Sequence, residues 1–143
     1  MKKAILMNIN TIEALDILDY GVTVLFRKKL PKNYVGDIYC YVSKKIYVGW
    51  CNLFRETIPF KIEISNQKVI ESHVKGLYVL KFDNFEVFDE PMQLNEFYIV
   101  NKDVREVGAF GHLFNEEELP NYVKLSKPPR NYQYVYVKEN NNG

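Results

Sequence analysis

The sequence predicts an α+β domain that is mainly β, a small β-barrel with one early helix and short peripheral helices. Many short segments alternate apolar and polar residues, a period typical of half-buried strands. Eleven Tyr, nine Phe and one Trp make up 15% of the chain, and such rings pack well on pleated sheets. Several short strands with a strand-like segment near the C-terminus favour a closed or nearly closed barrel.

The one long helix is predicted over residues 11–20. Asn10 and Glu13 have the spacing of a capping box, and Gly21 is a typical residue after the last helical turn. Ile12, Leu15 and Leu18 recur at helical spacing and give an apolar stripe.

The alternating segments are predicted strands. The clearest has Phe60, Ile62 and Ile64 on one side, with Lys61 and Glu63 between them. Predicted strands cover residues 4–8, 22–30, 37–43, 46–54, 59–65, 76–82, 85–88 and 131–137, and short helical turns cover 93–97 and 116–119.

The length of 143 residues suits a single domain. We assign residues 1–138 to that domain and residues 139–143 to a frayed polar tail. No run approaches the roughly 20 apolar residues of a membrane helix, so we expect a cytoplasmic protein that does not bind membranes. Two cysteines are too few for a disulfide scaffold. We expect no cofactor and, because His73 and His112 are isolated, no metal.

The charges are unevenly distributed although the net charge is only +1. Residues 1–45 carry eight Lys or Arg against four Asp or Glu, whereas residues 83–118 carry ten acidic residues against two basic ones. This asymmetry predicts a basic surface formed by one part of the chain and an acidic surface formed by another.

Three stretches carry a family resemblance. They are residues 23–31 (TVLFRKKLP), residues 38–44 (IYCYVSK), and residues 83–91 (DNFEVFDEP) with Leu94 and Phe97. Their order and spacing, with the later Lys127-Pro128-Pro129, resemble the ASCH domains of the PUA-like superfamily, of the type that phages and prophages encode.

The resemblance implies a barrel with a cleft beside the first helix that binds RNA, a nucleotide or a modified base. Some ASCH proteins remove the acetyl group of N4-acetylcytidine with a Lys and a Glu near a Thr. Aligned on Arg27, the chain matches the family at Thr23, but Val22 stands at the Lys and Gly21 at the Glu. Since valine cannot accept a proton, we predict a non-enzymatic binding protein; a divergent amidohydrolase is an alternative.

Basic and aromatic residues of the first third of the chain form the predicted site. Arg and Lys neutralise phosphates, and Tyr and Trp rings stack on unpaired bases. The predicted ligand-binding residues are Thr23, Arg27, Lys28, Lys29, Tyr41, Ser43, Lys44 and Trp50. The same pattern also fits a solvated strand face with Tyr in the barrel wall, and Arg27 can instead pair with Asp83 or Glu86.

The acidic segment suggests a different function. Asp89-Glu90 and the run of residues 116–118 (EEE) can dock on a basic partner. A phage protein with such a surface is a candidate anti-defence protein, for example an anti-CRISPR, that inhibits a host nucleic-acid-handling complex. Ordinary solubility explains the same charges.

Overall fold

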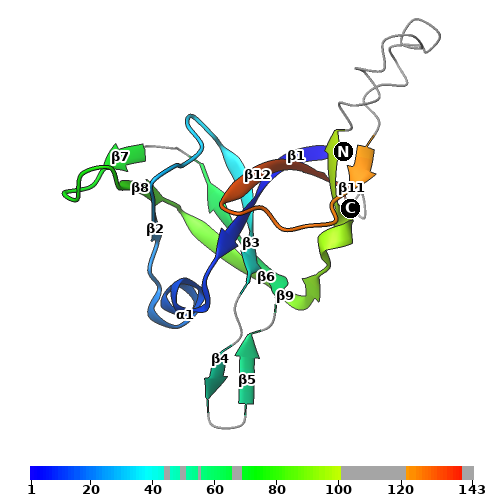
Figure 1. Ribbon diagram of the computed structural model, residues 1–143, viewed down its shortest axis with the longest axis horizontal. Helices are drawn as coiled ribbons and strands as arrows, with labels where there is room; N and C mark the ends of the chain where they lie inside the picture. Colours follow the sequence, from blue (N-terminus) through cyan, green and yellow to red (C-terminus); the bar gives the residue numbers. More distant parts are fainter. Residues whose placement is uncertain (44–45, 49–50, 55, 66–68, 101–121, 140–143) are drawn as a thin grey trace, which may run out of the picture.

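The computed structural model describes residues 1–43, 46–48, 51–54, 56–65, 69–100 and 122–139, which form two sheets, a hairpin and one α-helix (Figure 1). The elements are β1 (Lys2–Ile9), α1 (Thr11–Tyr20), β2 (Val24–Arg27), β3 (Gly36–Val42), β4 (Ile46–Val48), β5 (Cys51–Phe54), β6 (Thr57–Ile64), β7 (Val69–Glu71), β8 (Tyr78–Lys81), β9 (Asn84–Met92), the 3₁₀ helix η1 (Leu94–Glu96), β10 (Phe97–Val100), β11 (Tyr122–Lys124) and β12 (Tyr132–Val137).

The larger sheet has seven strands in the order β11-β10-β12-β1-β3-β6-β9. Only β1 and β3 are parallel, and the connection between them contains α1 and β2. β12 returns to pair antiparallel with β1, so Lys2 lies opposite Val137 and Met7 opposite Tyr132. The two ends of the described chain therefore lie side by side (Figure 1).

A separate sheet has the order β2-β8-β7, and β4 pairs with β5 in a hairpin. Leu25 and Leu80, which lie opposite each other, are buried. With α1, this small sheet covers one face of the large sheet (Figure 1).

Two apolar cores lie on opposite faces of the seven-stranded sheet, because successive strand residues point to opposite sides. On β1, Ile5, Met7 and Ile9 join the first core with α1 and the small sheet. Ala4 and Leu6 join the second core, which includes Phe97 and Val135. Most of the predicted apolar alternation is thus confirmed.

Local signals set the bounds of α1 as predicted, but the buried face differs from the predicted stripe: Ile12 is 66% exposed, whereas Ala14 and Ile17 are buried. The Asn10 side chain accepts a hydrogen bond from the Glu13 N–H at 2.8 Å, and the Glu13 Oε1 accepts from the Asn10 N–H at 3.1 Å. Both bonds of the capping box are therefore present. Gly21 ends the helix with φ +67°, a conformation that glycine adopts without strain.

The class, α+β and mainly β, is confirmed, but the described strands do not close into a barrel. Among the described strands, β9 ends the large sheet and pairs with β6 alone. Pro59 and Pro91 lie where the β6 and β9 registers shift, because proline cannot donate a ladder hydrogen bond. Exposed Asp89 and Glu90 with Pro91 make β9 a protected edge strand that resists further pairing.

Other differences from the predicted elements are local. The segment 46–54 forms two antiparallel strands, since the chain reverses between Val48 and Cys51. Strands β7, β10 and β11 were not predicted, whereas the helical turn predicted at 93–97 is present as η1. The predicted turn at 116–119 and residues 140–143 of the tail lie outside the described residues. Within the described ranges, no helix is long and apolar enough to cross a membrane.

Candidate functional site

The Arg27 guanidinium lies against the first turn of α1. It forms an ion pair with the Glu13 carboxylate through both terminal nitrogens, with Nη2 2.9 Å from Oε1. Nη1 also donates to the Phe26 carbonyl at 2.7 Å, and Nη2 donates to the Asn8 carbonyl at 3.1 Å. The Arg27 side chain is only 16% exposed. This guanidinium therefore joins β1, α1 and β2, and an incoming phosphate has to displace a carboxylate to reach it.

The predicted partners of Arg27, Asp83 and Glu86, make other contacts. Asp83 accepts hydrogen bonds from the backbone N–H and hydroxyl of Ser65 at 2.6 and 2.5 Å, which lower the pKa of its carboxyl group. Glu86 lies 3.6 Å from the Lys61 ammonium. Arg27 therefore forms a structural ion pair, but its partner is Glu13 rather than Asp83 or Glu86.

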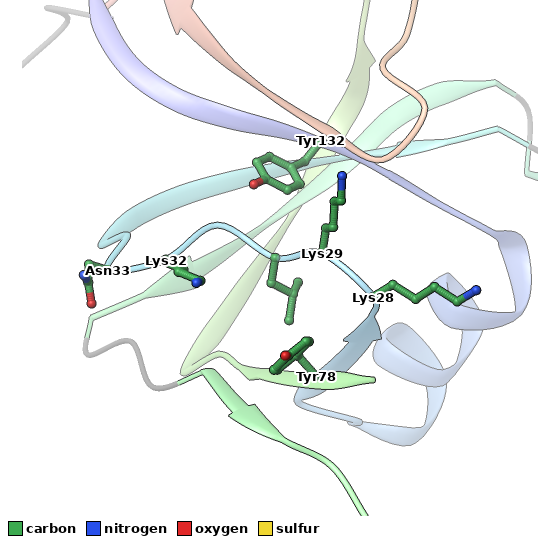
Figure 2. A pocket seen from close by; sticks show the side chains of 7 residues that line it. Lys28, Lys29, Lys32, Asn33, Tyr78 and Tyr132 are labelled. Carbon is green, nitrogen blue, oxygen red and sulfur yellow. The ribbon is translucent and has the colours of Figure 1, made fainter. Parts of the chain in front are cut away.

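The segment that follows β2, residues 28–33, forms one side of a cavity of about 610 Å³. Tyr78 from β8 and Tyr132 from β12 supply aromatic walls (Figure 2). The lining residues are Lys28, Lys29, Leu30, Lys32, Asn33, Tyr78 and Tyr132, which we call the lysine–tyrosine pocket.

Three contacts fix the backbone of this segment. Arg27 holds its start, as described above. The Asn131 side chain donates to the Lys29 carbonyl at 2.8 Å, which links the segment to the start of β12. Leu30 is 7% exposed and belongs to the first core. Asn33, with φ +55°, adopts the left-handed conformation that Asn tolerates better than most residues. The pocket wall is thus anchored at several points.

The pocket is positively charged. Lys28, Lys29 and Lys32 are exposed, and none of the described residues that line the pocket is an Asp or Glu. In the part of the chain that the structure describes, no carboxylate forms an ion pair with these ammonium groups. Three like charges at the mouth of one cavity raise the local concentration of anions.

The tyrosine rings lie on different sides of the lysine-bearing segment. Figure 2 shows Tyr132 above the segment and Tyr78 below it, with Lys29 extending toward the side of Tyr132. Both rings are partly exposed and pack against the first core. Anchored rings with accessible faces are suitable surfaces for a planar ligand.

A second cavity, of about 620 Å³, differs in charge. Tyr39 and Tyr98 line it, together with Lys124 and Lys138 and with Glu96 and Glu139. Because its two lysines are balanced by two glutamates, this cavity attracts an anion less than the lysine–tyrosine pocket does.

The structure brings only two of the predicted site residues into the pocket, Lys28 and Lys29, and adds Lys32 from the same basic group. Thr23 is exposed, and its carbonyl accepts from the Phe82 N–H at 3.0 Å. Ser43 lies at the end of β3, where its N–H donates to the Ile9 carbonyl at 3.3 Å. Neither lines the pocket.

Tyr41 lies on the opposite face of the sheet. It is 8% exposed within the second core, and burial raises the pKa of its phenol. Its ring therefore packs in the protein interior, as the alternative to ligand binding expected, and the sheet separates it from the pocket. Lys44 and Trp50 lie outside the described residues, as do residues 116–118 of the proposed acidic surface.

The two remaining chemical expectations concern cysteine and metal. Cys40 is a free, fully buried cysteine, and burial raises the pKa of its thiol. Among the described residues, no three His, Cys, Asp or Glu side chains are grouped to hold a metal ion.

No family model matches the chain, and no curated protein or solved structure is significantly similar to it. The resemblance to ASCH domains therefore stays a prediction.

Sequence reasoning did not identify Tyr78, Tyr132 and Asn33 as site residues. The alternation of tyrosines in residues 131–137 indicated a strand, but nothing local indicated its partner. Tyr132 reaches the pocket because β12 pairs with β1. Tyr78 reaches it because β8 pairs with β2, which places Tyr78 opposite Arg27, next to Lys28 and Lys29.

Proposed function

We propose that the lysine–tyrosine pocket binds a nucleotide, either free or within a single-stranded nucleic acid. The observation that carries the proposal is the composition of the pocket, where three lysines and two tyrosines meet and no carboxylate lies among the described lining residues. Lysine ammonium groups are point charges that neutralise phosphate, and tyrosine faces stack on bases. The ligand class agrees with what the resemblance to ASCH domains implies.

The size of the pocket supports a ligand of this class. Small-molecule pockets commonly enclose about 300–1,000 Å³, and this one encloses about 610 Å³. The lysine side chains are exposed, so they adjust to phosphates in different positions. The backbone beneath them is anchored by Leu30 and by the bond from Asn131 to Lys29.

Fluorescence titration with a labelled mononucleotide, repeated at rising salt concentration, tests the proposal. If the same titration is made with a short single strand, three phosphate-neutralising lysines predict a slope of log K against log salt of about −2, and the mononucleotide should show a shallower slope. The Lys28→Ala and Lys29→Ala variants should bind more weakly and have a shallower slope. Tyr132→Ala should weaken binding, whereas Tyr132→Phe, which keeps the ring face, should bind normally.

Lys81→Ala is the matched control. Lys81 is exposed and lies on β8, but it points to the opposite face from Tyr78 because the two residues differ by an odd number along the strand. This variant should bind as the unchanged protein does. No binding at low salt, or equal losses in the Lys81 and Lys29 variants, would refute the proposal.

A further inference from the structure

We infer that the lysine–tyrosine pocket is the first of three base-stacking positions along β12, and that the natural ligand is therefore a single strand of nucleic acid. This inference rests on the proposed nucleotide function of the pocket. The three positions are Tyr132, Tyr134 and Tyr136, which we call the β12 tyrosine row. Lys3 of the neighbouring strand β1 lies beside it.

The register places the row on one face of the sheet. Tyr132 lies opposite Met7, Tyr134 opposite Ile5 and Tyr136 opposite Lys3. The β1 part of this face is covered by the first core, which contains Met7 and Ile5. Beyond that core the tyrosines reach the surface, and Tyr134 is 40% exposed. The row is thus a continuation of the pocket wall formed by Tyr132.

The spacing of the row suits an unstacked strand. The ring centroids of Tyr132 and Tyr134 are 6.3 Å apart, with planes at 83°. Bases stacked in a duplex are only about 3.4 Å apart along each strand. One base per ring therefore requires a stretched strand with its bases turned apart, which is how proteins commonly recognise single strands.

Charge and packing agree with this assignment. The Lys3 ammonium lies over the face of the Tyr134 ring, 4.7 Å from its centroid. A base that stacks on this face therefore displaces the flexible lysine side chain, whose ammonium then pairs with the adjoining phosphate. Tyr34 supports the Tyr134 ring from its edge, with centroids 6.1 Å apart. The supported ring loses little freedom when a base stacks on it.

The row also has a defined end. Tyr122 packs edge-on against Tyr136, with centroids 5.1 Å apart. The neighbouring cavity pairs Lys124 and Lys138 with Glu96 and Glu139, so it has no excess of positive charge to attract a further phosphate. The site should therefore accommodate three nucleotides.

The test compares labelled oligonucleotides of one to six residues of one base, at constant salt. Affinity should rise from the mononucleotide to the trinucleotide and then stay constant. Tyr134→Ala should weaken trinucleotide binding about 5- to 150-fold, the range found when one stacking aromatic is removed, and should weaken mononucleotide binding much less. Tyr134→Phe should retain trinucleotide binding, and a duplex should bind no better than the mononucleotide.

The outcomes separate this inference from the proposed function. A mononucleotide that binds with the same affinity as longer strands overturns the inference and leaves the pocket intact; the row is then a surface for another class of partner, such as a protein. A mononucleotide that fails to bind while Tyr134→Ala weakens binding of the trinucleotide refutes the pocket and retains the row. Equal binding of duplex and single strand also overturns the inference.

Discussion

Replacement of Arg27 by alanine should unfold the protein more easily rather than simply remove a ligand contact. The substitution leaves the Glu13 carboxylate without its ion-pair partner and removes the donors to the Asn8 and Phe26 carbonyls. An exposed ion pair contributes about 0–1 kcal/mol, and breaking a fully buried one costs about 3–5 kcal/mol. The Arg27 and Glu13 side chains are 16% and 24% exposed. We therefore expect the free energy of unfolding to fall by about 2–4 kcal/mol.

Urea denaturation followed by circular dichroism measures this change. Glu13→Gln tests the other partner, because glutamine keeps an oxygen that can accept from the Asn10 N–H and so preserves the capping box. The double variant should show a coupling energy of about 1–3 kcal/mol between Arg27 and Glu13. Lys28→Ala, the neighbouring exposed lysine, should change the stability by less than about 0.5 kcal/mol.

The result that would refute this reasoning is specific. If Arg27→Ala keeps its stability but no longer binds nucleotides, the guanidinium is a ligand-binding group, as the sequence first suggested. If it loses stability and the remaining folded protein binds with a normal salt slope, the three pocket lysines carry the electrostatic contribution.

Two further predictions concern titratable groups, and a third concerns the activity that the resemblance to ASCH domains implies. Burial opposes the charge of Lys61, but its hydrogen bond to Asp37 and the nearby negative charges outweigh this effect and raise its pKa. The stabilisation from this raised pKa is fully present below the unfolded pKa of about 10.4 and is lost as pH rises through the folded value. The destabilisation caused by Lys61→Met, measured by urea titration, should therefore shrink from about pH 9 to about pH 11.5. If the unfolding free energies of the variant and the unchanged protein differ by the same amount over this range, the assignment is wrong. Because burial raises the pKa of its thiol, Cys40 in a Cys51→Ser variant should resist alkylation at pH 8 until urea unfolds the chain; rapid labelling of the native protein argues against the buried position. Incubation with N4-acetylcytidine should release no cytidine, and steady turnover would restore the amidohydrolase alternative.

The bounds of the helix could be predicted accurately because the signals at its ends are local, whereas its buried face, which includes Ala14 and Ile17 but not Ile12, depends on the sheet that it packs against. Asn10, Glu13 and Gly21 act within one or two turns, and the structure contains each of the contacts that their spacing predicts. The strands could be predicted in outline for the same reason, since a period of two is visible without knowledge of the partner strand.

Sheet closure could not be predicted, because it depends on which edges pair. β2 has the strand pattern that a barrel needs, yet it pairs with β8 in a separate sheet. β9 continues through Pro91 to Met92, but its register against β6 shifts on the way. The residues of β2 do not indicate its partner strand, and the charges and Pro91 of β9 indicate an edge strand but not which strand it pairs with, since pairing depends on contacts between segments distant in sequence.

The site illustrates the same limit and suggests how the binding residues divide their roles. A run such as residues 27–29 (RKK) predicts one basic patch, but the structure separates its members. Arg27 is held by Glu13, whereas Lys28 and Lys29 extend from the anchored segment that follows. Arg27 has a planar group suited to a carboxylate, and the lysines are flexible point charges suited to phosphates. The arginine thus fixes the start of the segment, and the lysines remain available to a ligand because they have no carboxylate partner among the described residues.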